Sequence, residues 1–232
     1  MDFRNRHVVV TGGTGALGSA LVGMLLDGGA VCHVPWVNDR ELQRFPYRSH
    51  THVRLVEAEL TDEAGVAHLF DGVPRLWASI HIAGGFAMEA VAKTSKAALM
   101  QQVDTNFVSC FLCCAAAVRT MAKNGAGGRI VNIAARPGLE WRSGARMVAY
   151  TASKAAVAAL TVALAEEVAK LDILVNAVAP SIIDTPSNRE AMPRADHAAW
   201  PKPDEIASTI LFLASPDNRV TRGAVVPVYG KV

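Results

Sequence analysis

The sequence predicts an α/β fold, a single doubly wound domain in which a parallel sheet of about seven strands carries helices on both faces. Short β-branched apolar segments alternate with longer helical stretches along the whole chain, which is typical of a parallel sheet buried on both faces. A glycine-rich turn joins the first strand to the first helix. The 232 residues, 51% of them apolar and 19% charged, suffice for one large domain, and we expect residues 1–232 to form it.

The elements follow one another in a regular order. The first strand is predicted over residues 7–11 and the first helix over about residues 16–26, where Asp27-Gly28-Gly29 ends it. Further strands are predicted at residues 30–34, 53–56, 76–82, 129–133, 173–178 and 224–228, and two long Ala-rich helices at 95–123 and 149–170. Ligands of such sheets bind at the carboxyl ends of the strands, so the functional residues should lie there.

Composition and charge exclude several classes of protein. The net charge of +2 comes from scattered Lys and Arg, which gives no indication of a nucleic-acid partner. The longest apolar stretches, residues 107–118 and 155–165, are shorter than the roughly 20 residues that span a bilayer, so we expect no membrane helix. The N-terminus enters a strand without the apolar segment of a secretory signal, and we expect a cytoplasmic protein.

Four cysteines stand at positions 32, 110, 113 and 114, and Cys110 with Cys113 forms a Cys-x-x-Cys pattern. The pattern lies in an apolar helical run that has no His or carboxylate close by to complete a metal site. Free cysteines packed as small hydrophobic side chains are the favoured interpretation. We therefore expect no metal.

The glycine-rich turn has the pattern of a dinucleotide-binding loop. Gly12, Gly15 and Gly18 lie between the first strand and the first helix, where absent side chains let the backbone approach a pyrophosphate. This context favours a Rossmann-type nucleotide site over a plain glycine-rich turn. Gly84 and Gly85 after the fourth strand would form the neighbouring wall, although alone they fit any loop of this kind.

Cofactor choice depends on the end of the second strand, where an acidic residue would bind the ribose 2′-hydroxyl and a basic one would favour a 2′-phosphate. Here the strand ends at Pro35-Trp36 without a charge, and Asn38, Asp39 and Arg40 fit either cofactor or a solvated loop. The sequence therefore leaves NAD(H) and NADP(H) open.

Tyr150 and Lys154 form a candidate proton-transfer pair. Residues four apart share a helix face, so the Lys154 ammonium can lie beside the Tyr150 phenol and stabilise its phenolate. A tyrosine with its ordinary pKa of about 10 is a poor base at neutral pH, and a neighbouring cation corrects this. The pair alone is weak evidence, but with the glycine loop it indicates redox chemistry with a nicotinamide cofactor.

On these residues the chain resembles the short-chain dehydrogenase/reductase family over nearly its whole length. The matching motifs occur in the family's order: residues 11–18, Ala83-Gly84-Gly85, Asn106, Gly128-Arg129-Ile130-Val131-Asn132, Tyr150 with Lys154, Asn176-Ala177-Val178-Ala179-Pro180, Ile206-Ala207 and Phe212-Leu213-Ala214-Ser215. The resemblance implies that Tyr150 is the acid/base, that Lys154 binds the nicotinamide ribose, and that Asn106 holds a water in a proton relay. It also implies an NAD(P)-dependent oxidoreductase of a small-molecule substrate, and a homodimer or homotetramer formed through the two long helices.

The same resemblance implies a set of cofactor-binding residues. They are Gly12, Thr14, Gly15, Ala16, Leu17, Gly18, Trp36, Ala83, Gly84, Gly85, Tyr150, Lys154, Pro180, Ile183 and Thr185. Thr185 lies where the family contacts the nicotinamide carboxamide, and the alternative is a loop threonine before a proline.

Two further features have two interpretations each. Residues 186–201 form either a lid over the substrate or an exposed connector. Trp141 and Trp200 either stack on a flat substrate or pack within the protein.

One catalytic residue of the family is absent. Where the family has a serine that polarises the substrate, this chain has Ala135. An alanine cannot donate to a developing oxyanion, and the loss of one such donor commonly costs about 3 kcal/mol. Ser143 is the nearest hydroxyl upstream of Tyr150, although it lies outside the family's register.

The missing serine fits a narrower resemblance to the dihydropteridine reductases, which also lack it. Residues 184–196, 15–19 and 83–85 resemble that group, whereas Pro35 stands where it has the acidic residue that selects NADH. The leading hypothesis is an NAD(P)H-dependent reductase of a quinonoid or conjugated small heterocycle. Two alternatives stay open: an oxidoreductase of an ordinary alcohol/ketone pair, with Ser143 or a water as donor, and a non-catalytic NAD(P)-binding sensor or scaffold.

Overall fold

The computed structural model describes residues 1–232 and confirms the predicted fold class. Seven parallel strands form one sheet in the order β3-β2-β1-β4-β5-β6-β7. The strands are β1 (His7–Thr11), β2 (Val31–Trp36), β3 (Val53–Glu57), β4 (Leu76–His81), β5 (Gly128–Ile133), β6 (Ile173–Pro180) and β7 (Val225–Val228), each on a segment predicted to be a strand. The strand order reverses between β1 and β4, so a ligand crevice is expected beside the carboxyl ends of these two strands.

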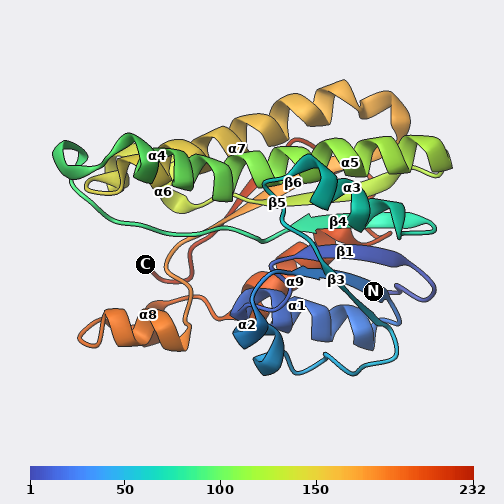
Figure 1. The fold of residues 1–232 in the computed structure, drawn as a ribbon, viewed down its shortest axis with the longest axis horizontal. Helices are drawn as coiled ribbons and strands as arrows, with labels where there is room; N and C mark the ends of the chain where they lie inside the picture. The colour runs from blue at the N-terminus through green and yellow to red at the C-terminus, as the bar shows by residue number, and fades with distance from the viewer.

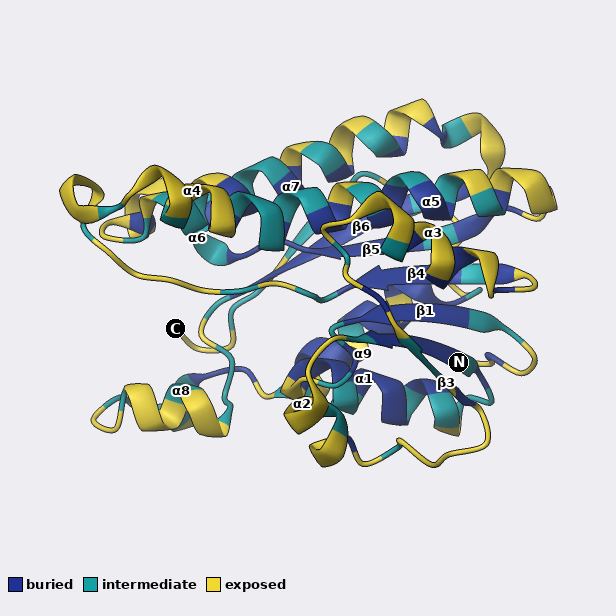
Figure 2. Ribbon diagram, viewed as in Figure 1, coloured by how far each residue is buried: buried dark blue, intermediate teal, exposed yellow.

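Helices cover both faces of the sheet (Figure 1). α1 (Ala16–Asp27) and α9 (Pro203–Ala214) pack on one face, and α3 (Glu63–Asp71), α5 (Ser109–Asn124) and α7 (Val148–Glu167) pack on the other. The two apolar layers contain 23 and 22 buried residues, so the sheet is shielded from water about equally on both faces. In Figure 2 the strands are buried between helices whose outer sides are exposed.

The remaining α-helices are short, and each follows the carboxyl end of a strand along the chain. They are α2 (Asp39–Arg44), α4 (Lys96–Val103), α6 (Arg136–Leu139) and α8 (Pro186–Ala191). Single 3-10 turns occur at Val91–Lys93, Trp141–Gly144, Ala169–Leu171 and His197–Ala199. Residues 186–201 therefore contain α8 and one of these turns, and α8 stands apart from the sheet (Figure 1).

The predicted helix over residues 95–123 consists of three pieces. α4 passes into a π-helical turn, Asp104–Val108, which passes into α5. Lys96–Asn124 and α7 are long and apolar enough to cross a membrane, by length and composition only. The expectation that every apolar stretch is too short for this is therefore wrong. Both helices pack on the sheet, and core helices of this kind pass the same test.

The cysteines of α5 lie beside a histidine, so the interpretation that no His is close to them is wrong in three dimensions. The ligand atoms of His81, Cys110 and Cys114 lie within 4.8 Å of one another. Nδ1 of His81 donates to Oδ1 of Asn132 at 2.8 Å, Cys114 donates to the same oxygen, and the Asn132 amide donates to Thr161. This buried network joins β4, β5, α5 and α7.

A pair of histidines lies toward the amino-terminal ends of the strands. Nδ1 of His7 on β1 and Nε2 of His33 on β2 are 2.8 Å apart. Burial lowers the pKa of His33 to about 4, and the nearby His7 and Arg54 add to this effect. Folding therefore favours the neutral form of His33.

We expect the free energy of unfolding to decrease as the pH falls from 6.5 to 4. The unfolded chain protonates His33 near pH 6.5 and the folded chain only near pH 4, so the stabilisation is present above pH 6.5 and is lost as the pH falls through 4. The full loss is up to about 3 kcal/mol. Urea unfolding of the wild type and of His33→Phe at pH 7, 5.5 and 4.5 measures it, and an equal pH dependence in the variant would contradict the assignment.

Candidate active site

The glycine loop between β1 and α1 has no room for side chains at its central positions. Gly12 has a φ of +65°, and a Cβ on it would lie 2.7 Å from the backbone nitrogen of Ala83. A Cβ on Gly18 would collide with the carbonyl oxygen of Gly12. α1 begins after Gly15 without a side-chain cap and without an acidic residue in its first turn. The backbone here forms a cradle that an anion can approach, as the sequence predicts.

A cavity of about 300 Å³ lies beside this loop, and its walls come from the carboxyl ends of β1, β2, β3 and β4. Five predicted cofactor residues line it: Gly12, Thr14, Trp36, Ala83 and Gly84. Pro35, Val37, Glu41, Ala58, Glu59, Leu60, Thr61, Thr105 and Ser109 complete the wall. Most of these have no motif around them, so no sequence signal placed them in the wall of this cavity.

The other predicted cofactor residues lie outside this cavity. They are Gly15, Ala16, Leu17 and Gly18 at the start of α1, Gly85 after β4, Tyr150 and Lys154 on α7, and Pro180, Ile183 and Thr185 at and after the end of β6. All of them follow a strand of the sheet at its carboxyl end or lie on α7, which packs on β5 and β6. Their roles in cofactor binding stay predictions.

Asn106 connects the helical layer with the loop after β4. It lies in the π-helical turn, is 1% exposed, and its Oδ1 accepts from the Gly85 N–H at 2.9 Å while its Nδ2 donates to the Gly85 carbonyl at 3.0 Å. A Cβ on Gly84 would lie 2.7 Å from Oδ1 of Asn106 and 3.3 Å from Nζ of Lys154. The structure therefore brings Asn106 and Lys154 close to the same face of one glycine.

Lys154 is a buried cation on α7. Its side chain is almost completely enclosed, and its ammonium donates to the carbonyl oxygen of Ile133, the last residue of β5, at 2.8 Å. Burial lowers its pKa to about 8. The residue thus keeps its charge at neutral pH but loses it more easily than an exposed lysine.

Tyr150 lies one helical turn before Lys154, near the start of α7. Burial raises its pKa to about 12. The Phe86 ring stands edge-on to the phenol ring, with 5.0 Å between the centroids, and Phe86 is itself 61% exposed. The protonated phenol is the stable form in the protein alone, which suits a residue that donates a proton.

Ala135 lies at the junction of β5 and α6 and is buried. This junction packs on α7, because a Cβ on Gly138 would lie 2.8 Å from the backbone carbon of Lys154. The only nearby serine that the sequence indicated, Ser143, is exposed and donates its hydroxyl proton to the carbonyl of Glu140 at 2.7 Å. Position 135 therefore has no hydroxyl, and the Ser143 hydroxyl is engaged in its hydrogen bond to the Glu140 carbonyl.

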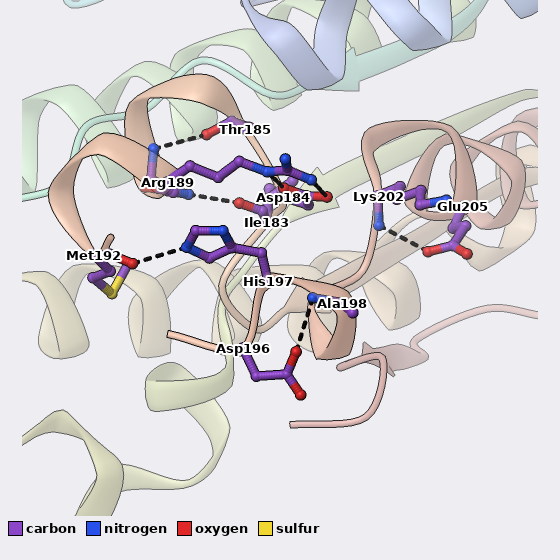
Figure 3. Close-up of polar contacts among 11 residues, drawn as sticks. Ile183, Asp184, Thr185, Arg189, Met192, Asp196, His197, Ala198, Lys202 and Glu205 are labelled. Atoms are coloured by element: carbon purple, nitrogen blue, oxygen red, sulfur yellow. Dashed lines mark hydrogen bonds and ion pairs between the residues drawn. The ribbon is translucent and has the colours of Figure 1, made fainter. Parts of the chain in front are cut away.

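The segment after β6 is held by its own polar contacts (Figure 3). The Thr185 hydroxyl caps α8 by accepting from the Asn188 N–H at 3.2 Å, and the Arg189 guanidinium pairs with Asp184 through two hydrogen bonds. His197 contacts the Met192 carbonyl with Nε2 at 2.8 Å. Thr185 thus has a structural role as a helix cap, and its contact with a cofactor stays a prediction.

The two candidate stacking residues differ in their surroundings. Trp200 is 5% exposed and packs against the His197 ring at 4.6 Å, so it is a packing residue in this structure. Trp141 is 73% exposed and is held by a hydrogen bond from its Nε1 to the Gly138 carbonyl. Only Trp141 presents its ring to solvent.

Comparison with known proteins identifies the family of this chain. The family profile described as "short chain dehydrogenase" matches residues 6–196. The chain belongs to the short-chain dehydrogenase family. It is an NAD(P)-dependent oxidoreductase, because that chemistry and cofactor define the family. The predicted family and enzyme class are confirmed.

Several relatives cover the whole chain. BbsD of Thauera aromatica, a subunit of (2S)-((R)-hydroxy(phenyl)methyl)succinyl-CoA dehydrogenase, is 31% identical over 99% of this chain and 97% of its own. Galactitol 2-dehydrogenase of Rhizobium johnstonii is 33% identical over 96% of this chain and 93% of its own. A solved short-chain dehydrogenase/reductase family protein superposes with a TM-score of 0.90 at 29% identity, covering 99% of this chain and 98% of its own. A further neighbour, ElxO with NADP bound, has a TM-score of 0.87 at 24% identity, with 97% and 98% covered, which shows the fold.

Gly18→Ala is expected to weaken NADH and NADPH binding at least about 10-fold, because the new Cβ pushes the Gly12 carbonyl into the cradle. Gly72→Ala is the matched control, since its Cβ would meet only an ordinary contact at 3.7 Å. Fluorescence titration measures both affinities, and circular dichroism checks the fold. Unchanged affinity in Gly18→Ala would mean that the loop is not the cradle.

Cofactor affinity is expected to fall as the pH rises through about 8, because Lys154 then loses its positive charge. The same titration from pH 6.5 to 9 measures this, with Lys154→Met as control. The variant should bind more weakly at pH 7 and lack this pH dependence. A parallel decline in the variant would assign the titration to another group.

Proposed function

We propose that the protein reduces a small conjugated molecule of the quinonoid type with NADH or NADPH, in the manner of the dihydropteridine reductases. The observation that carries the proposal is Ala135. A buried methyl group stands where the reaction of a simple ketone would place a hydroxyl donor. A substrate that does not need this donor fits the site best.

The chemistry divides between the cofactor and three side chains. NADH or NADPH, when bound in the cavity beside the glycine loop, would supply the hydride. The Tyr150 phenol gives its proton to a heteroatom of the substrate, and the Lys154 ammonium stabilises the phenolate that remains. The Asn106 amide holds the Gly85 backbone in place beside them, so the proton donor and the cofactor loop keep a fixed relation.

The type of substrate follows from where negative charge develops. Hydride addition to a simple ketone concentrates charge on one oxygen, and the loss of a donor to that oxygen costs about 3 kcal/mol. In a quinonoid ring the charge spreads over the conjugated system, so protonation by Tyr150 is the main requirement. The exposed Phe86 ring beside Tyr150 adds a flat apolar surface that suits such a ring.

The second candidate function is the oxidation or reduction of an ordinary alcohol/ketone pair. It is favoured by the names of the relatives, which include dehydrogenases of hydroxy compounds and of a sugar alcohol. This reading needs a substitute for the missing donor. Ser143 suits that role poorly because its hydroxyl donates a hydrogen bond to the backbone carbonyl of Glu140, which leaves a bound water.

We also propose that Pro180, Ile183 and Thr185 contact the nicotinamide end of the cofactor, since they follow the carboxyl end of β6. We further propose a cytoplasmic homo-oligomer formed through the long helices. Phe111 on α5 and Val162 on α7 support it, because both are apolar and nearly half exposed on the outer face of the helical layer.

The proposal predicts NAD(P)H-dependent reduction of a quinonoid dihydropterin generated in the cuvette, and a loss of at least about 100-fold in Tyr150→Phe, which lacks the proton donor. Oxidation of NADH and NADPH is followed in turn by absorbance, with a panel of simple ketones measured in parallel. Cofactor titration of the variant confirms that binding is retained.

Each alternative has its own outcome in this experiment. Turnover of ketones but not of the quinonoid substrate would replace the proposal with the second candidate. Cofactor binding without turnover of any substrate in the panel would favour a sensor or scaffold. Full activity in Tyr150→Phe would reject Tyr150 as the proton donor.

A further inference from the structure

The cavity at the ends of β1 to β4 contains an acidic side chain from an unexpected element. β2 ends at Trp36 without a charge, as the sequence shows. Glu41, five residues further on and in the first turn of α2, lines the same cavity together with Thr14 of the glycine loop. A strand-end motif cannot reveal a residue that α2 brings back to the strand end.

Two sets of hydrogen bonds hold Glu41 in this position. Oδ1 of Asn38 caps α2 by accepting from the N–H groups of Arg40 and Glu41, at 2.9 and 3.4 Å. The Glu41 carboxylate accepts from the Thr14 hydroxyl at 3.1 Å. The carboxylate is therefore tied to the loop that forms the phosphate cradle, on the side that faces the end of β2.

The charge balance of the cavity wall favours a neutral ribose. The wall contains two acidic side chains, Glu41 and Glu59, and no lysine, arginine or histidine. Glu59 is engaged locally, because its Oε1 accepts from the backbone and hydroxyl of Thr61 at 3.0 and 2.9 Å. Glu41 makes one hydrogen bond and keeps further acceptor sites for a ligand.

Arg40, which directly precedes Glu41, is the basic residue that could bind a 2′-phosphate. It is exposed, and it does not line the cavity, although its N–H group, like that of Glu41, bonds to the Asn38 cap of α2. A 2′-phosphate placed beside Glu41 would meet a like charge without a cationic partner in the wall. A 2′-hydroxyl would instead donate to the carboxylate in a charge-assisted hydrogen bond.

We propose that Glu41 accepts hydrogen bonds from the adenosine ribose hydroxyls and makes this enzyme selective for NAD(H) over NADP(H). The inference rests on the cofactor role in the proposed function, and it adds a cofactor preference, which the sequence left open. Glu41 takes the place of the acidic residue that would otherwise stand at the end of β2.

Titration of the full chain with NADH and NADPH at one ionic strength tests the proposal without any substrate. The wild type is expected to bind NADH at least about 100-fold more tightly, because like charges repel the 2′-phosphate. Glu41→Gln is expected to weaken NADH binding about 10-fold and to tighten NADPH binding, so that the ratio falls below about 5.

Glu59→Gln is the matched control, since it removes the other carboxylate of the wall. Its NADH to NADPH ratio should stay within about 3-fold of the wild-type ratio. An equal collapse of the ratio in this variant would assign selectivity to the general field of the cavity and overturn the proposal. An unchanged ratio in Glu41→Gln would overturn it as well.

The experiment separates this inference from the proposed function. If both dinucleotides bind the wild type equally, or NADPH binds better, the role of Glu41 is wrong while the reductase proposal stands. If neither binds, the nucleotide site itself fails, and the proposed function and this inference fall together.

Discussion

The hydrogen bonds between the Asn106 amide and the backbone of Gly85 are the contact on which the active site depends. They connect the helical layer, which carries the proposed catalytic side chains, with the loop after β4, which forms a wall of the proposed cofactor cavity. Gly84, next to Gly85, has no space for a Cβ, because a Cβ there would meet both Asn106 and Lys154. The π-helical turn at Asp104–Val108 places Asn106 at this point, and π turns often mark functional positions in helices.

The buried Lys154 is the second constraint. An isolated ammonium in an apolar interior is costly, and here the Ile133 carbonyl at the end of β5 offsets part of that cost. The same position places Lys154 one helical turn from Tyr150, and in the proposed function its charge stabilises the phenolate. The fold and the proposed chemistry therefore depend on the same arrangement of β5 and α7, which the alanine at position 135 leaves intact.

The sequence revealed the parts of the site that depend on local pattern. Periodicity predicted the strand segments, and steric rules predicted the glycine loop; the structure confirms both. The four-residue spacing placed Tyr150 and Lys154 on one helix, and both lie on α7. The sequence did not reveal contacts between segments far apart in the chain. The approach of His81 to Cys110 and the return of Glu41 to the strand end both depend on packing that no spacing rule expresses.

The central claim is that this site works through proton transfer from Tyr150 without a hydroxyl at position 135. The most direct measurement is the rate of quinonoid dihydropterin reduction by Ala135→Ser, which restores the missing donor, compared with the wild type at saturating cofactor. The account predicts rates within about 3-fold of each other, because the substrate has little use for the added hydroxyl. A gain of about 100-fold or more would contradict it, since the missing donor would then limit the reaction.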